Sequence, residues 1–335
     1  MRTYNLCVVG FGNVGKALVA LLREKEPELR DRYSIGWRVT GVSSRRLGWL
    51  VAANGFSAEK LLSGDLSEGQ KTTNVREWLR LGKSDVLFEV SSLNASTGQP
   101  ATDYLRAALE AGAHAITANK GPVLHAWREL TTLAAAQNRR FLHESAMMDG
   151  VPIFSLFRET LPAIEVRGFR GVLNSTTTVV LDAMAEGLSF DDAIREAQRL
   201  GVAETDPSHD VDGIDAAVKI VGLTTVLMNG NLTLADVRRH GIRDIDREQL
   251  RDAQASGEVW RLVSRARREG GSITASVAPE RLQARDPFST VRGTSLLISF
   301  ETDIFPELII GERDPGPQAT AYGLLADFIT AVRSA

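Results

Sequence analysis

The chain has 335 residues, of which 43% are hydrophobic and 24% charged, with a formal net charge of −3. This length exceeds what one ordinary hydrophobic core accommodates, so we expect two domains. The charge balance, without a basic run, argues against nucleic-acid binding, and no apolar stretch is long enough to cross a membrane. The N-terminus lacks the order of a signal peptide, so we expect a cytoplasmic protein. A single cysteine, Cys7, excludes an intrachain disulfide.

The first predicted strand leads directly into a glycine-rich turn. Residues 4–10 (YNLCVVG) have the continuous apolar character of a buried parallel strand. Gly10, Gly12 and Gly15 then form G-x-G-x-x-G, and an apolar helical pattern follows. Such glycines allow a sharp bend and a close approach of backbone to a pyrophosphate, which lies on the helix N-terminus. The pattern predicts dinucleotide binding, and the alternative is a tight structural turn.

The second predicted strand, residues 37–43, ends where the adenosine ribose of a dinucleotide is expected. A site that prefers NAD usually has an acidic residue there, whereas this sequence has Ser43, Ser44, Arg45 and Arg46. Hydroxyl and guanidinium groups suit a 2′-phosphate, so we predict a preference for NADP, with NAD as the alternative cofactor. In the alternative interpretation the arginines are merely exposed.

The next strands deliver polar residues to the same edge of the predicted sheet. Residues 50–81 are expected to form short helices and loops. Strand 84–91 is followed by a polar loop that starts at Ser91, and helix 104–110 precedes strand 114–117, which leads to Lys120. Ligands of open α/β sheets bind at the carboxyl ends of strands, so Ser91 and Lys120 are expected beside the nicotinamide.

A strand at 140–144 is expected to close the first domain. The elements after it predict a second domain, with strands at 166–174, 258–266, 273–279 and 294–300 and helices at 181–184, 190–200, 213–229 and 247–255, and a last helix at 319–332. The predicted fold class is α/β: a Rossmann-type dinucleotide-binding domain over residues 1–150 and an α+β substrate-binding and dimerisation domain over 151–310. The C-terminal helix, 311–335, is expected to return to the first domain and to leave no room for a regulatory domain.

An acidic segment precedes the helix predicted from residue 213. Residues 200–223 (LGVAETDPSHDVDGIDAAVKIVGL) include Glu204, Asp210 and Asp215, and Lys219 follows Asp215 by one helical turn. A loop of carboxylates beside a lone lysine suits a site that holds a cationic amino group and transfers a proton. The alternative is a solvated loop with a surface ion pair.

Taken together, GFGNVG, TANKG, HESAMMDGVPI, GVLNSTT and LGVAETDPSHDVDGIDAAVK make the chain resemble the homoserine dehydrogenases over nearly its whole length. The resemblance implies NAD(P)-dependent interconversion of aspartate 4-semialdehyde and homoserine, in the biosynthesis of threonine and methionine, by a homodimer. It also implies substrate contacts from Glu204 and Asp215, with Asp210 beside them in the acidic loop, proton transfer by Lys219, and Lys120 in the active site.

The resemblance and the motifs together give the candidate ligand sites. The candidate cofactor contacts are Gly10, Gly12, Asn13, Val14, Gly15, Arg45, Ser91, Lys120 and Gly201. The resemblance also implies a monovalent cation, Na⁺ or K⁺, held by Glu144, Met147, Asp149 and Val151. The sequence departs from the family pattern at Ser175, at Met147 and Met148, and over residues 311–321.

Three alternatives stay open from the sequence. An aspartate-semialdehyde dehydrogenase would need a cysteine nucleophile, and Cys7 lies in the first predicted strand, away from the expected cleft. A reductase of the same fold could act on a different amino-alcohol. A sensor without catalytic activity would bind NADPH and leave it unoxidised.

Overall fold

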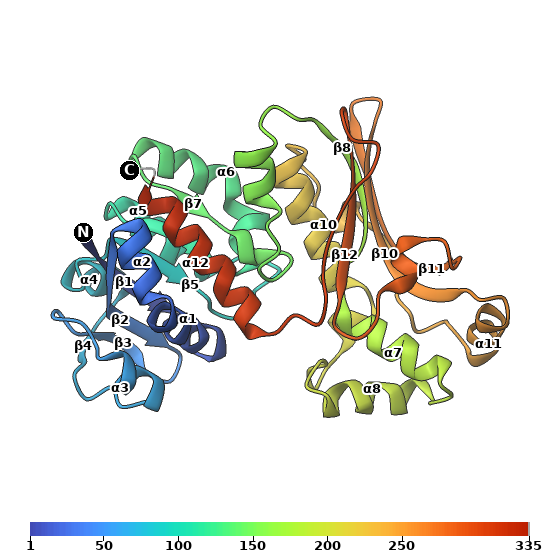
Figure 1. Ribbon diagram of the computed structural model, residues 1–335, viewed down its shortest axis with the longest axis horizontal. Coiled ribbons are helices and arrows are strands. Elements are labelled where there is room, and N and C mark those ends of the chain that lie inside the picture. The colour runs from blue at the N-terminus through green and yellow to red at the C-terminus, as the bar shows by residue number, and fades with distance from the viewer. Residues whose placement is uncertain (334–335) are drawn as a thin grey trace. The chain divides into compact units, whose positions relative to one another are not determined.

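The computed structural model describes residues 1–333 and divides the chain into two compact units (Figure 1). The first unit consists of Met1–Ser155 and the segment that begins at Gly316, and the second is Leu156–Pro315. The predicted limits, residues 150 and 310, fall slightly before these. Residues 311 and 312, which the prediction gave to the C-terminal helix, are the end of a strand of the second unit.

The first unit is built on one mainly parallel sheet. Its strands are β1 (Arg2–Val9), β2 (Ile35–Ser44), β3 (Gly48–Val51), β4 (Gln70–Thr72), β5 (Val86–Glu89), β6 (His114–Thr117) and β7 (Phe141–Leu142). Their order in the sheet is β4-β3-β2-β1-β5-β6-β7, with β3 and β4 antiparallel to their neighbours. Its helices are α1 (Asn13–Glu24), α2 (Glu26–Tyr33), α3 (Ala58–Ser63), α4 (Val75–Leu81), α5 (Ala101–Glu110), α6 (Lys120–Ala136) and α12 (Pro317–Arg333).

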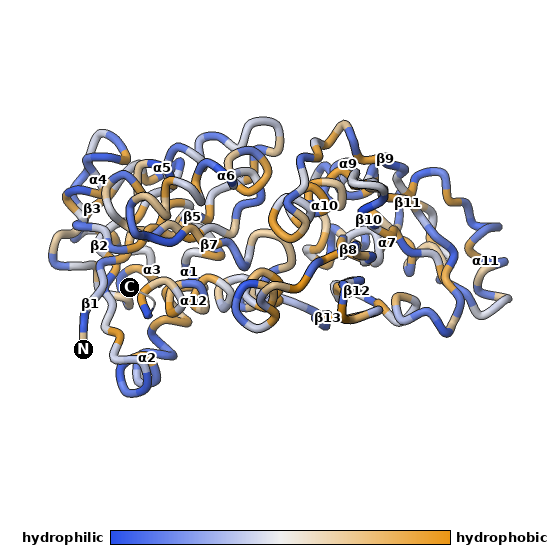
Figure 2. The backbone as a smooth tube through the Cα atoms, turned by 90° about the horizontal axis from the view of Figure 1, so that it is seen from above, coloured by the Kyte–Doolittle hydropathy of each residue, from blue (hydrophilic) through white to orange (hydrophobic). Residues whose placement is uncertain are grey.

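Both faces of this sheet are covered, which explains the unbroken apolar run of β1. Leu6 and Val8 belong to a core with α1 and α12, whereas Cys7 and Val9 belong to a second core with α4, α5 and α6. Successive side chains of a strand point to opposite faces, so each half of the run fills one core. In Figure 2 the tube of α2 is largely hydrophilic, whereas that of α12 is largely hydrophobic.

The C-terminal helix α12 packs against α1 and completes the first core (Figure 1). The ring of Phe328 makes edge contacts with Tyr4 of β1 and Phe88 of β5, with centroids 5.9 and 6.0 Å apart. Such aromatic pairs add to the stabilisation that comes from burying their area. The first unit is therefore assembled from both ends of the sequence.

The second unit combines an antiparallel sheet with helices. Its strands are β8 (Val166–Val172), β9 (Arg238–Arg239), β10 (Val259–Glu269), β11 (Ser272–Leu282), β12 (Leu296–Thr302) and β13 (Leu308–Glu312). They are ordered β13-β12-β8-β10-β11-β9. Within this sheet, all of whose strands lie in the described residues, β11 and the short β9 are parallel and the other neighbouring pairs are antiparallel. Its helices are α7 (Ser175–Ala185), α8 (Phe190–Arg199), α9 (Ser208–Val211), α10 (Ile214–Leu227) and α11 (Arg247–Ala255), of which α7, α10 and α11 pack on β10.

The predicted fold class, a Rossmann-type domain followed by an α+β domain, is confirmed. Two predictions of local structure were wrong. The segment 50–81 also contains the end of β3 and the short strand β4, which are set by pairing, of β3 with β2 and of β4 with β3, rather than by a periodic pattern. The predicted strand at 140–144 is limited to β7, and Glu144 begins a 3-10 turn, Glu144–Ala146. No helix within residues 1–333 is both long and apolar enough to cross a membrane.

His114, at the start of β6, makes the stability of the first unit depend on pH. Its ring is buried, and Nδ1 accepts a hydrogen bond from the backbone N–H of Arg140 at 3.1 Å. Burial, helped by neighbouring arginines, lowers the pKa of His114 from 6.5 to about 4. The folded protein thus keeps the ring neutral at pH values where the unfolded chain binds a proton.

We expect the free energy of unfolding to fall as the pH decreases from about 6.5 towards 4, by up to roughly 3 kcal/mol from this residue, because one pKa unit corresponds to about 1.4 kcal/mol. His114→Asn keeps an acceptor for Arg140 and should flatten this dependence in denaturant unfolding curves. His209→Asn, at an exposed position, is the control and should behave as the unchanged protein. Equal pH dependence in all three proteins would contradict the assignment.

Candidate active site

A pocket of about 780 Å³ lies at the carboxyl ends of β1, β2 and β5 in the first unit. Its wall is formed by Val9, Gly10, Phe11, Gly12, Ser43, Ser44, Arg45, Arg46, Gly48, Trp49, Val90, Ser91, Ser92, Asn94, Gln99, Pro100 and Tyr104. The predicted cofactor residues Gly10, Gly12, Arg45 and Ser91 therefore border one cavity. Asn13, Val14 and Gly15 form the first turn of α1, directly after this wall. The position agrees with the general location of ligands in open α/β sheets.

Gly10 has to be a glycine for two independent reasons. Its φ is +91°, in the left-handed region that favours glycine, and a Cβ atom there would lie 2.4 Å from the carbonyl carbon of Val90. The N–H groups of Gly10 and Phe11 both donate to the carbonyl of Ser43, each at 2.8 Å. The turn after β1 is therefore fixed between the ends of β2 and β5.

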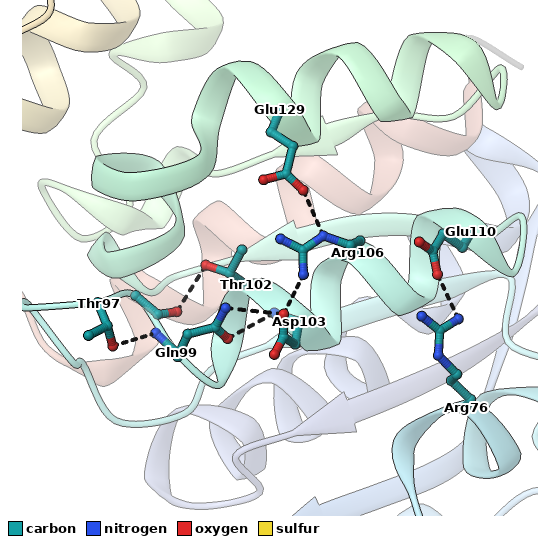
Figure 3. A network of polar contacts seen from close by, with 9 residues as sticks. Arg76, Thr97, Gln99, Thr102, Asp103, Arg106, Glu110 and Glu129 are labelled. Atoms are coloured by element: carbon teal, nitrogen blue, oxygen red, sulfur yellow. Dashed lines mark hydrogen bonds and ion pairs between the residues drawn. The ribbon is translucent and has the colours of Figure 1, made fainter.

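Polar contacts link the part of the pocket wall that contains Gln99 to helices α5 and α6 (Figure 3). The side chain of Gln99 donates to Asp103 of α5 at 3.1 Å, and its N–H donates to Thr97 at 3.2 Å. Arg106 of α5 then pairs with Asp103 and, at 2.6 Å, with Glu129 of α6. The segment that carries Gln99 is thus linked through α5 to α6.

Lys120 is the first residue of α6 and is partly buried. The residue before it, Asn119, caps the helix by accepting the N–H of Gly121 at 3.0 Å. The Asn119 amide also donates to the carbonyls of Ser91 and Ser92, at 3.2 and 3.4 Å. The helix that begins with Lys120 is therefore joined to the wall of the pocket.

A second polar cluster lies in the second unit, around the start of α7 and α10. The ammonium of Lys219 donates to the carbonyl of Leu173 and pairs with Asp215 at 3.2 Å. The side chain of Asn174 donates to Asp210 at 2.7 Å and to Asp215 at 3.1 Å. The Lys219 and Asp215 side chains are only 12% and 17% exposed. The predicted pair is therefore a partly buried network rather than a surface ion pair.

The electrostatics of this cluster suit a cationic ligand and proton transfer. Burial raises the pKa of Asp210, and the nearby charge of Asp215 raises it further, while the bond from Asn174 opposes the shift. Two carboxylates and one ammonium leave excess negative charge in a partly desolvated place. Lys219 is the only lysine after Lys120 in a sequence rich in arginine, and lysine is the basic side chain better suited to losing a proton.

The acidic loop differs in exposure from the cluster around Asp215. The side chain of Glu204 is exposed, and the backbone there is held by Gln198, whose side-chain amide donates to the carbonyls of Glu204 and Thr205 at 3.0 and 3.2 Å. Gly201, a predicted cofactor contact, is also exposed, with a φ of +72° after α8. Roles for Glu204 and Gly201 stay predictions.

The expected cation ligands lie on one segment of the first unit. The Glu144 carboxylate accepts the backbone N–H groups of Phe154 and Ser155, each at 2.7 Å. The backbone turns at Asp149 with a φ of +48°, and the side chain of Asp149 accepts a bond from Thr320 of α12 at 3.0 Å. Within residues 1–333 no group of three or more His, Cys, Asp or Glu residues is arranged for a metal. Met147 and Val151 are buried in the same segment.

Cys7 cannot act as a nucleophile. It is fully buried in β1, and burial raises the pKa of its thiol to about 11. At neutral pH the thiol is protonated and inaccessible, whereas the thiolate is the reactive form. A mechanism of the aspartate-semialdehyde dehydrogenase type, which needs such a cysteine, is excluded for this residue.

Sequence reasoning missed two residues that organise these clusters. Asn174 occupies the N-cap of α7, accepting the N–H of Thr177 at 2.9 Å. An asparagine between a predicted strand and a helix is a typical cap signal, although not a signal for bridging two carboxylates. Glu89 is a charged residue in the apolar run VLFEV, and that interruption was the available signal.

The two lysines assigned to the active site lie in different units, Lys120 in the first and Lys219 in the second. That both act in one active site stays a prediction.

Comparison with known proteins covers both units. The model of the family described as homoserine dehydrogenase matches residues 152–329, and that described as homoserine dehydrogenase, NAD binding domain, matches residues 10–144. A relative from Pseudomonas canavaninivorans, named NAD(+)-dependent homoserine dehydrogenase, is 33% identical over 100% of this chain and 98% of its own. A homoserine dehydrogenase from Methanocaldococcus jannaschii is 32% identical over 97% of each chain.

Solved structures agree with these relatives. A putative homoserine dehydrogenase from Archaeoglobus fulgidus has a TM-score of 0.86 with 29% identity, covering 98% of both chains. A mutant hyperthermophilic archaeal homoserine dehydrogenase, solved in complex with NADPH, has a TM-score of 0.83 with 29% identity, covering 100% of this chain and 99% of the other. The resemblance inferred from the motifs is confirmed: the chain belongs to the homoserine dehydrogenase family.

Proposed function

We propose that the protein is an NAD(P)-dependent oxidoreductase that interconverts L-aspartate 4-semialdehyde and L-homoserine. The observation that carries the proposal is the partly buried cluster of Lys219, Asp215, Asn174 and Asp210, which joins a proton donor to two carboxylates. It lies within the long acidic motif by which the chain resembles its family. The two family matches, which together span residues 10–144 and 152–329, support the same activity.

The cluster can bind the substrate and transfer a proton. The carboxylates of Asp210 and Asp215 attract the substrate ammonium, and that attraction offsets the cost of removing a cation from water. An ammonium group has three N–H donors, and the contacts of Lys219 with Leu173 and Asp215 use two of them. The third can stabilise the negative charge that grows on the aldehyde oxygen and then supply its proton. Lys120 is proposed to assist at the same oxygen.

The pocket of the first unit is proposed to hold the dinucleotide. The pyrophosphate would lie on the turn of Gly10 and Gly12 and on the N–H groups of the first turn of α1, where Gly12 offers no side chain as a cap. Arg45 and Arg46 would contact a 2′-phosphate, and Ser91 would lie beside the nicotinamide half. When bound, the reduced nicotinamide supplies the hydride for the aldehyde carbon.

Three further features belong to the proposal. Carboxylate and carbonyl oxygens are suitable ligands for Na⁺ or K⁺, so Glu144 and the carbonyls of Met147, Asp149 and Val151 are proposed to hold a monovalent cation.

We propose a homodimer formed through the second unit, supported by the exposed apolar side chains of Ile304, Phe305 and Ile309, which lie in β13 and just before it. We propose a cytoplasmic location on the grounds of the dinucleotide cofactor.

The activity is tested with purified protein, homoserine and NADP or NAD, by following the absorbance of the reduced nicotinamide. Lys219→Ala is expected to lower kcat by a factor of roughly 10²–10⁴, because a proton-transfer group is lost, while NADPH still binds with fluorescence enhancement. Near-normal turnover by Lys219→Ala would refute its role. NADPH binding without oxidation in the presence of semialdehyde would instead favour a sensor.

Two variants of Asn174 separate its role as the cap of α7 from its role as the bridge between Asp210 and Asp215. Asn174→Ser keeps an oxygen that can cap α7 but removes the amide that donates to both Asp210 and Asp215. Losing even one hydrogen bond to a charged group would lower kcat about tenfold, so we expect a decrease of at least that size, with little change in stability. Asn174→Ala should also lower the free energy of unfolding by about 1 kcal/mol. Full turnover by Asn174→Ser, measured beside urea unfolding of all three proteins, would show that the bridge has no catalytic importance.

Arg45 and Arg46 are expected to set the cofactor preference. Replacing either by Ala should lower kcat/KM for NADPH by about tenfold or more, because a charge-assisted bond to phosphate is lost, and should change the value for NADH less than twofold. Arg32→Ala, on the exposed face of α2, is the matched control. A clear NADH preference of the unchanged protein would overturn the prediction.

A further inference from the structure

Glu89 is a buried acid at the carboxyl end of β5, behind the pocket of the first unit. Its side chain is fully buried, and its three strand neighbours, Val86 to Phe88, are apolar and equally buried. Burying a carboxyl group is costly, and an apolar side chain of the same volume is commonly as stable or more stable in such a position. Packing alone therefore does not explain why a glutamate occupies this position.

The two carboxyl oxygens of Glu89 point to two different loops. Oε1 accepts the backbone N–H of Ser91 at 2.9 Å and contacts the Ser91 hydroxyl. Oε2 accepts the hydroxyl of Thr117 at 2.7 Å. Ser91 belongs to the pocket wall after β5, whereas Thr117 ends β6 and precedes the turn into α6. One side chain thus joins the ends of two adjacent parallel strands.

Asn119 closes these contacts into a ring. Its N–H donates to the hydroxyl of Thr117 at 2.9 Å, and its amide donates to the carbonyls of Ser91 and Ser92. Its side-chain oxygen caps α6 through Gly121, next to Lys120. The path from Glu89 through Thr117 and Asn119 therefore ends at the backbone of the proposed catalytic lysine.

The surrounding groups agree with a role at the pocket. Burial raises the pKa of Glu89, and bonds from Ser91, Thr117 and Asn119 oppose that shift by favouring the charged form. Tyr104, which lines the pocket, has its phenol pKa raised by burial and then by the charge of Glu89. The acid is thus within electrostatic reach of the cavity although it is covered by the loop.

We propose that Glu89 is a positioning residue for the reaction: by holding the Ser91 loop with one oxygen and the Thr117–Asn119 turn with the other, it sets Lys120 against the wall that receives the cofactor. This inference rests on the proposed function for the part that concerns Lys120. It does not require contact between Glu89 and any substrate. Displacements of about 1 Å in an active site can lower the rate by about 10²-fold, so the geometry of such a ring has kinetic consequences.

The test separates the two arms of the ring. Ser91→Ala removes a hydroxyl on the pocket side, so it should raise the dissociation constant of NADPH several-fold. Thr117→Val keeps the shape of the strand residue but removes the link to Asn119, so it should lower kcat by roughly tenfold to a hundredfold with NADPH affinity within twofold. Glu89→Gln, which cannot serve both loops as an acceptor, should change both quantities.

Two comparisons distinguish positioning from ordinary stability. Thr132→Val removes a hydroxyl on α6 that donates to the carbonyl of Arg128 in its own helix at 2.8 Å, and it should leave both quantities unchanged. The double variant Glu89→Gln with Thr117→Val should lose no more kcat than Glu89→Gln alone, because both changes break the same link. Thermal unfolding of every variant shows whether activity loss merely follows stability loss.

The outcomes distinguish a failure of the positioning role of Glu89 from a failure of the proposed function. If Glu89→Gln and Thr117→Val both keep kcat and NADPH affinity within twofold, or if kcat per folded molecule is unchanged while stability falls, the positioning role is wrong. If Glu89→Gln does not fold, the two single variants still test the proposal, because Ser91→Ala should raise the dissociation constant of NADPH and Thr117→Val should lower kcat. If the unchanged protein does not oxidise homoserine, the proposed function fails. In that case unchanged NADPH affinity in both Ser91→Ala and Glu89→Gln would also overturn the ring.

Discussion

The close approach of the Gly10 turn to the peptide between Val90 and Ser91 is the constraint on which the first unit depends. No side chain fits at Gly10, because a Cβ atom would overlap the carbonyl carbon of Val90. The same turn is bonded to Ser43 at the end of β2. Three strand ends are therefore fixed against each other, and the pocket, the arginines after β2 and the Ser91 loop take their places from that contact.

The two units treat buried carboxyl groups differently. Glu89 accepts hydrogen bonds from neutral donors, namely hydroxyl, amide and backbone N–H groups. Asp215 has a cation, Lys219, as its partner, and shares the amide of Asn174 with Asp210. Neutral donors hold a loop in place without supplying a transferable proton, whereas an ammonium can also give one away. The Glu89 network therefore suits positioning, whereas the Lys219–Asp215 network suits proton transfer.

Much of the fold could be predicted because its signals are local. Strand β6 and helix α11 were predicted with their observed limits, since a short segment with Ala115 and Ile116 at its centre defines the first and a capping box of Asp246 and Gln249 starts the second. Strands β3 and β4 carry no such signal, because β3 forms by pairing with β2 and β4 forms by pairing with β3. The bridging by Asn174 and Glu89 depends on contacts between residues far apart in the sequence, which neither periodicity nor spacing encodes.

The return of α12 to the first unit has a consequence for how the chain is made. Phe328 and its neighbours fill a core whose other members, such as Tyr4 and Phe88, lie near the beginning of the sequence. During translation the uninterrupted segment 156–315 leaves the ribosome before the last part of the first unit has been synthesised. Domains usually mature in the order of their synthesis, but here the earlier one must wait, with one sheet face only partly covered by α1, for its final helix.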